Sequence, residues 1–214
     1  METSPSAPPP RAEGPDKAVP DFSPPALPDH DLLHVIGRGA YGEVWLARHT
    51  RLGTLRAIKI IRRDHFGDAR PFQREFDGIR RYEPISRAHP NLVSILHVGG
   101  TDACFYYVME LADDATLPTD SCLEIAHALA SALAHLHGHG LVHRDVKPSN
   151  IIFVGGAAKL ADIGLVAGVD DARSFVGTEG YIPPEGPGTP SADCYSLGKL
   201  LYELSTGHDR TAWP

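Results

Sequence analysis

Hydrophobic and polar residues alternate in several short runs along the first half of the chain, as they do in β-strands. These runs cover residues 31–36, 44–49, 54–61, 92–98 and 105–110. Because successive side chains of a strand point to opposite faces, the alternation predicts a sheet of five short strands. Residues 71–82 interrupt the pattern with helix-forming residues and charge on one side, which predicts a single helix among the strands.

In the second half of the chain, apolar residues recur with the spacing of α-helices. Residues 121–137 predict a helix whose apolar stripe consists of Leu123, Ala126, Ala130, Leu133 and Leu136. Ser121 and Glu124 fit a capping box at its start, and glycines at 138 and 140 supply a stop. Residues 191–204 predict a second strong helix, and residues 151–153 a short strand between the two.

The first 30 residues differ from everything that follows, because they contain nine prolines. Proline blocks helices and removes backbone donors, so this stretch predicts a disordered tail with some polyproline-II character. A plain flexible tail is favoured over a ligand for an aromatic-grooved domain. The expected organisation is therefore a tail over residues 1–30 and one domain over residues 31–214.

Composition and net charge limit the classes of protein to which the chain could belong. The 214 residues are 42% hydrophobic and 22% charged, which is typical of a globular domain. A net charge of −7 argues against general nucleic-acid binding, and we find no apolar run long enough to span a membrane. The three cysteines form no C-x-x-C pair, which favours reduced thiols and a cytoplasmic location.

Residues 143–150, with the sequence HRDVKPSN, bring a carboxylate, an ammonium group and an amide close together. Asp145 can orient a hydroxyl and accept its proton, Lys147 can neutralise charge on a moving phosphate, and Asn150 can hold a metal ion. These are the groups that phosphoryl transfer from a nucleotide requires.

This segment resembles the catalytic loop of protein kinases, H-R-D-x-K-P-x-N, in its serine/threonine form. Six further motifs of that family follow one another in the expected order: G-x-G-x-x-G-x-V at 37–44, A-I-K at 57–59, H-P-N at 89–91, D-I-G for D-F-G at 162–164, G-T-x-x-Y at 177–181 and P-P-E for A-P-E at 183–185. A lone G-x-G-x-x-G also occurs in dinucleotide-binding folds, where a helix follows, but here a strand follows.

The resemblance implies an α+β, bilobal protein-kinase-like fold. Residues 31–112 would form an N-terminal lobe with a five-stranded antiparallel sheet, and residues 113–214 a mostly helical, shortened C-terminal lobe. Asp193 would tether the catalytic loop. The family also has further C-terminal helices, one of which carries an arginine that pairs with the position of Glu185, so the resemblance predicts a truncated lobe.

The resemblance also assigns roles to individual residues. Asp145, Lys147, Lys59 and Glu75 would be the catalytic set, and Asn150 and Asp162 the ligands of Mg²⁺. Glu83 and Asp77 remain alternatives to Glu75 as the partner of Lys59. The residues expected to bind ATP are Ile36, Gly37, Arg38, Gly39, Ala40, Tyr41, Gly42, Val44, Ala57, Lys59, Glu110, Ala112 and Ile152. The activation segment would contain Ser174 as a phosphorylation site, Thr178 bonded to Asp145 and Lys147, and Glu185.

The expected function is transfer of the ATP γ-phosphate to serine or threonine hydroxyls of a protein substrate, with Mg²⁺. Two alternatives stay open: a catalytically impaired nucleotide- or protein-binding module, and a fragment of a longer kinase. A small-molecule phosphotransferase fits the features around Thr178 and Glu185 less well. The histidines at 135, 137, 139 and 143 are expected to be surface, packing or catalytic-loop residues rather than a metal site.

Overall fold

The computed structural model describes residues 25–39, 42–63, 69–101, 104–113, 122–162, 167–168, 177–209 and 211. Several expectations concern residues outside these ranges: the tail up to residue 24, the glycine-loop residues Ala40 and Tyr41, the capping residue Ser121, the pair Ile163 and Gly164, and the phosphorylation candidate Ser174.

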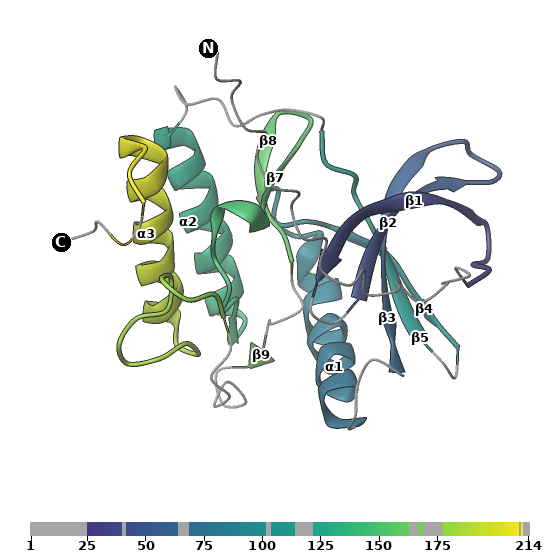
Figure 1. The fold of residues 1–214 in the computed structure, drawn as a ribbon, viewed down its shortest axis with the longest axis horizontal. Helices are drawn as coiled ribbons and strands as arrows, with labels where there is room; N and C mark the ends of the chain where they lie inside the picture. Colours follow the sequence, from purple (N-terminus) through teal and green to yellow (C-terminus); the bar gives the residue numbers. More distant parts are fainter. Residues whose placement is uncertain are drawn as a thin grey trace, which may run out of the picture.

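The N-terminal half forms the predicted five-stranded antiparallel sheet (Figure 1). The strands are β1 (His30–Gly39), β2 (Gly42–His49), β3 (Leu55–Arg62), β4 (Ile95–Gly100) and β5 (Cys104–Met109), in the order β1-β2-β3-β5-β4. The prediction of a strand from residue 92 was wrong. Leu92 instead bridges Leu160 in parallel, because Val93 N donates to Leu160 O at 3.1 Å and Leu160 N to Asn91 O at 2.9 Å.

The helix α1 (Ala69–Ser86) packs against this sheet and is longer than predicted. Its apolar face buries Phe72, Ile79 and Tyr82 in the same core as Phe105 and Tyr107 of β5. Pro84 lies in the last turn, where it interrupts the backbone hydrogen bonds of the helix only close to its end. Burial of this face therefore outweighs the weak helix signal that Gly78 and Pro84 give in the sequence.

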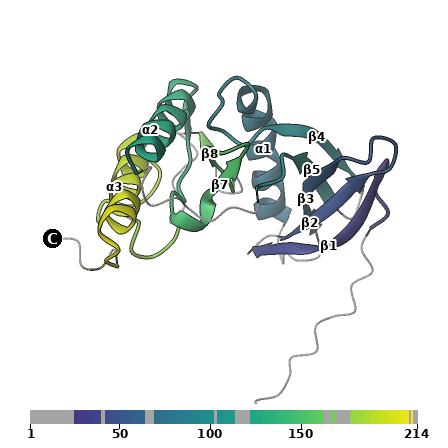
Figure 2. The same ribbon diagram turned by 90° about the horizontal axis from the view of Figure 1, so that it is seen from above.

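The C-terminal half is built on two helices, α2 (Cys122–Gly138) and α3 (Pro190–Thr206), which lie side by side (Figures 1 and 2). Two small antiparallel sheets accompany them: β6 (Leu141–Val142) with β9 (Ala167–Gly168), and β7 (Ile151–Val154) with β8 (Ala157–Leu160). Figure 2 shows these helices at the opposite end of the molecule from the five-stranded sheet, with β7 and β8 between them. The described residues thus form the predicted bilobal arrangement.

The apolar stripe predicted for α2 was partly wrong. The buried residues of this helix are Ile125, Leu129, Ala132, Leu133 and Leu136. Leu123 is 85% exposed and Ala130 is exposed as well. The buried face is turned relative to the predicted one because α2 packs against α3 and β8 at once, and periodicity alone does not specify that direction.

Gly42 is required by the close approach of β2 to β3. A Cβ atom at this position would lie 2.1 Å from the carbonyl oxygen of Ile60. A Cβ atom at Gly37, in contrast, would meet Val44 at an ordinary distance of 3.6 Å. The third glycine of the G-x-G-x-x-G motif therefore has a role in strand packing, whereas the described neighbours leave space at the first one.

One continuous core joins the two halves, from Ile61 of β3 and Tyr82 of α1 to Leu133 of α2 and Leu200 of α3. A second cluster lies on the other face of the sheet, where Leu27 packs with Trp45 and Ile58. Leu27 belongs to the stretch predicted as tail, and β1 begins one residue before the predicted domain boundary. Of the helices that the structure describes, none combines the length and apolar character needed to cross a membrane.

Candidate active site

The catalytic-loop segment, residues 143–150, is anchored by a buried aspartate of α3. Asp193 is 1% exposed, and its carboxylate accepts hydrogen bonds from His143 N at 2.8 Å and Arg144 N at 2.7 Å. Arg144 adopts a positive φ of 72°, an unusual backbone conformation for a residue with a side chain. The two hydrogen bonds hold this turn in place, and they confirm the predicted tether between Asp193 and the loop.

Sequence reasoning missed the part that His137 has in this anchor. Its Nε2 lies 2.9 Å from Asp193 Oδ2, so one carboxylate oxygen binds both α2 and the catalytic loop. The sequence alone predicts a surface or packing role for His137. It lies at the end of the helix, where periodicity gives no signal for a polar contact with a segment 56 residues away.

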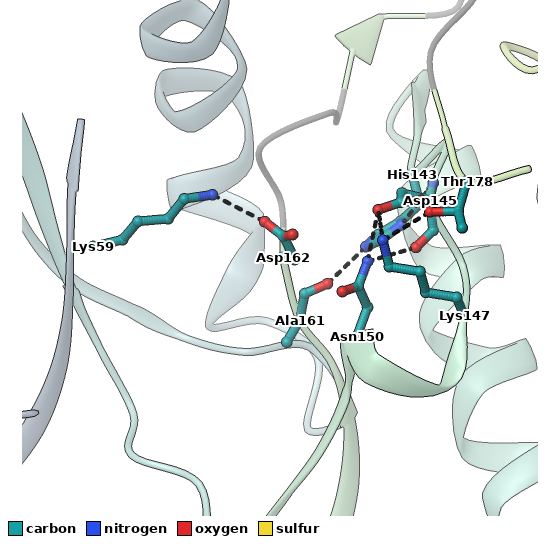
Figure 3. A network of polar contacts seen from close by, with 8 residues as sticks. All are labelled: Lys59, His143, Asp145, Lys147, Asn150, Ala161, Asp162 and Thr178. Carbon is teal, nitrogen blue, oxygen red and sulfur yellow. Dashed lines mark hydrogen bonds and ion pairs between the residues drawn. The ribbon is translucent and has the colours of Figure 1, made fainter. Parts of the chain in front are cut away.

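The predicted groups of the loop converge on Asp145 (Figure 3). Thr178 Oγ1 donates to Asp145 Oδ1 at 2.6 Å, and Lys147 Nζ donates to Thr178 Oγ1 at 2.8 Å. Lys147 also pairs with Asp145 Oδ2 at 2.8 Å, and Asn150 Nδ2 donates to the same oxygen at 3.0 Å. The expected bonds of Thr178 to Asp145 and Lys147 are thus present, and the carboxylate is fixed from three sides.

Lys59 lies on the other side of the site, where it contacts two carboxylates. Its Nζ is 2.9 Å from Asp162 Oδ1 and 3.6 Å from Glu75 Oε1. The two alternatives to Glu75 have other partners: Glu83 pairs with Arg87 at 2.7 Å, and Asp77 with Arg80 at 3.8 Å. Figure 3 shows Asp162 between Lys59 and the catalytic loop. Lys59, Glu75 and Asp162, which come from β3, α1 and the segment after β8, therefore meet at one site.

Burial decides the pKa of Glu75 in the Lys59–Glu75 pair, whereas neighbouring groups decide that of Lys59. Burial raises the pKa of Glu75 to about 7, although the positive charge of Lys59 opposes this change. For Lys59, burial alone would lower the pKa, but interactions with Tyr107, Asp162 and Glu75 more than offset it, so the pKa is raised. Lys59 is therefore charged at neutral pH, while the Glu75 carboxyl loses its proton near neutrality.

The raised pKa of Glu75 predicts that the free energy of unfolding depends on pH. Between the ordinary value of 4.5 and about 7, the folded protein retains a proton on Glu75 that the unfolded chain releases. Stability therefore falls as pH rises through this window, by about 2–3 kcal/mol for Glu75 alone. Urea unfolding from pH 4.5 to 7.5 should show this pH dependence in the wild type and not in Glu75→Gln. Parallel pH profiles for the two proteins would contradict the assignment.

The residues predicted to bind the nucleotide lie on several elements. Those on strands are Ile36, Gly37, Arg38 and Gly39 of β1, Gly42 and Val44 of β2, Ala57 and Lys59 of β3, and Ile152 of β7. Glu110 and Ala112 follow β5 directly. Ala57 is buried, Ile152 is half-buried and Ile36 is 46% exposed. Glu185 is exposed in the segment that precedes α3.

The side chain of Glu110 makes a contact that the sequence did not predict. Its Oε2 accepts hydrogen bonds from Ser94 N at 3.0 Å and from Lys159 Nζ at 2.7 Å. Lys159 belongs to β8, three residues before Asp162. The ion pair therefore links the segment after β5 to the strand that leads to Asp162.

The donor set fits a magnesium ion. The Asp162 side chain is 45% exposed, and the Asn150 amide uses its nitrogen to bind Asp145, so its oxygen is the atom left to face a metal. Carboxylate and amide oxygens are hard ligands, and Mg²⁺ typically takes one or two of them together with phosphate oxygens. Within the described ranges, no three or more His, Cys, Asp or Glu side chains are grouped as they would be to hold a metal ion.

The nearby histidines have other contacts. His143 Nε2 lies 3.1 Å from the carbonyl oxygen of Ala161, the residue before Asp162. His135 and His139 have ring centroids 4.5 Å apart, and His135 also packs on His89. These rings therefore serve packing and loop placement.

Comparison with known proteins agrees with this geometry. Residues 30–212 match the family described as protein kinase domain. Among curated proteins, the chain is 34% identical to serine/threonine-protein kinase PrkC of Bacillus subtilis, over 83% of this chain and 30% of that protein. It is also 34% identical to serine/threonine-protein kinase PknB of Mycobacterium leprae, over 86% of this chain and 34% of that protein. The chain thus spans about a third of the length of these relatives.

Proposed function

This chain belongs to the protein kinase family, in its eukaryotic-like serine/threonine branch, and on that premise we propose that it transfers the γ-phosphate of ATP to serine and threonine hydroxyls of proteins. The observation that carries the proposal is the position of Thr178, hydrogen-bonded to both Asp145 and Lys147. This contact places the segment after residue 176 against the catalytic groups, where a peptide acceptor would bind.

Asp145 is the group that receives the acceptor hydroxyl. Its Oδ2 takes hydrogen bonds from Lys147 and Asn150, while Oδ1 takes one from Thr178. A carboxylate oxygen has two lone pairs, so Oδ1 retains a position for a second hydroxyl. Asp145 orients the serine or threonine hydroxyl there and accepts its proton as the hydroxyl oxygen attacks the γ-phosphorus of ATP, while the bond from that phosphorus to the bridging oxygen breaks and ADP leaves.

The remaining charged residues hold the nucleotide. ATP bound with Mg²⁺ supplies the electrophilic γ-phosphoryl group. Asn150 and Asp162 would be the oxygen ligands for the metal, and Lys59, kept charged by its interactions with Tyr107, Asp162 and Glu75, would bind phosphate oxygens. Lys147 lies next to Asp145 and neutralises charge on the transferring group. The amides of residues 37–42 and the backbone of residues 110–112 would bind phosphates and adenine.

The proposal extends to the organisation and setting of the protein. It assigns residues 31–112 to the N-terminal lobe and residues 113–214 to the C-terminal lobe of a kinase domain, with Leu27 and His30 joined to the N-terminal lobe ahead of the predicted boundary. The partners are ATP and protein substrates rather than nucleic acid, consistent with a net charge of −7. The three free cysteines are compatible with a cytoplasmic setting.

Removal of the Thr178 hydroxyl tests the proposed function. Thr178→Val removes the bridge between Asp145 and Lys147, and we expect kcat for phosphorylation of a basic protein to fall by about 10–100-fold, the range for a lost positioning contact. Thr178→Ser keeps the hydroxyl and should stay within about threefold of the wild type. Equal rates for the valine and serine variants would show that the hydroxyl has no part in the reaction.

A further inference from the structure

Tyr107 is a buried ionisable residue that the mechanism above does not use. It lies on β5 directly opposite Lys59 of β3, so both side chains are on the same face of the sheet. The face is the one covered by α1, where Tyr107 is 1% exposed and shares the core with Phe72 and Ile79. A tyrosine hydroxyl at this depth requires a polar partner.

The available partner is the Lys59–Glu75 pair. Lys59 Nζ lies 6.0 Å from the centroid of the Tyr107 ring, and the ammonium group opposes the rise that burial causes in the pKa of the phenol. The titratable groups that interact with the phenol are Lys59 of β3, Glu75 and Tyr82 of α1, and Asp162 after β8. Tyr82 is already engaged, because its hydroxyl donates to Val93 O at 2.9 Å. Burial raises the pKa of Tyr107, so it is a neutral phenol at pH 7.

We propose that the Tyr107 hydroxyl is a positioning group for Lys59, which it fixes together with Glu75 so that one N–H of the ammonium points to the more exposed side, where Asp162 lies. Lys59 has three N–H donors. Glu75 and Tyr107 are both buried, whereas the Asp162 side chain, 2.9 Å from Nζ, is 45% exposed. The donor on the Asp162 side is the one that a nucleotide diphosphate would take. This inference rests on the proposed function only in naming that ligand.

The test uses ADP without a divalent cation, so that neither catalysis nor the metal enters the result. Calorimetric titration of Tyr107→Phe should give an ADP dissociation constant about tenfold higher than that of the wild type, as expected for a lost hydrogen bond to a charged group. Tyr106→Phe is the matched control: the neighbouring tyrosine is 4% exposed and packs in the cluster on the opposite face of the sheet. We expect it to remain within about twofold.

A double-mutant cycle separates positioning of Lys59 from general packing. In a Lys59→Met background, Tyr107→Phe should change ADP affinity by less than twofold, because the group that it positions is gone. An equal loss in both backgrounds, or no loss in either, would overturn the proposal. If the protein binds ADP in this pattern but transfers no phosphate, the positioning role stands and the proposed reaction fails.

Discussion

Replacing Asp145 by asparagine should lower kcat for phosphate transfer by about 10²–10⁴-fold, the usual contribution of a positioned proton acceptor. The amide can still orient a hydroxyl but accepts no proton at neutral pH. The fold should remain intact, because the amide oxygen can keep the contacts of Lys147 and Asn150 while the amide nitrogen donates to Thr178 Oγ1. Steady-state kinetics with Mg-ATP and a basic protein acceptor measure the change.

Asp113→Asn is the matched control for this variant. Asp113 is exposed, and its Oδ2 accepts a hydrogen bond from Gly156 N at 2.8 Å, away from the catalytic groups. We expect its kcat to stay within about twofold of the wild type. An Asp145→Asn enzyme that keeps more than roughly a tenth of wild-type kcat would mean that Asp145 is not the proton acceptor.

Replacing Asp193 by alanine should have the largest effect on stability. The substitution removes the acceptor for the amides of His143 and Arg144 and for His137, all on the buried side of the catalytic loop. Each buried donor left without a partner costs about 1–3 kcal/mol, so we expect the free energy of unfolding to fall by about 3–5 kcal/mol. For a domain of this size, that corresponds to a melting temperature lower by about 10 °C.

Asp193→Asn makes this prediction specific. The asparagine amide keeps one acceptor oxygen, so this variant should lose only part of the stability that the alanine variant loses. Chemical unfolding monitored by circular dichroism compares the three proteins. A loss below about 1 kcal/mol for the alanine variant would show that the loop has other anchors of equal strength.

Much of the candidate site could be predicted because short motifs place their groups with little dependence on the rest of the fold. Asp145, Lys147 and Asn150 lie within six residues, so local backbone geometry brings them together. Lys59 was expected on the third strand, and alternation alone placed it on the same face as Ala57. The tether by Asp193 and the contacts of Thr178 came from the family resemblance, and the structure contains them.

The contacts that the sequence did not predict are those between elements whose relative orientation is set by packing. His137 and Asp193 are on different helices, and their contact depends on how α2 lies against α3. Glu110 and Lys159 meet only because the segment after β5 passes close to β8. For the same reason, the buried face of α2 differs in direction from the predicted apolar stripe. Sequence periodicity describes single helices or strands, whereas these contacts depend on the relative orientation of two of them.

The most direct measurement of the central claim follows labelled γ-phosphate from Mg-ATP into a basic protein acceptor, with identification of the phosphorylated amino acids. The account predicts phosphoserine and phosphothreonine with the wild-type chain and at most about a hundredth as much of either with Asp145→Asn. Absence of transfer by the wild type, with ATP still raising its melting temperature, would contradict the account and identify a nucleotide-binding module in place of a kinase.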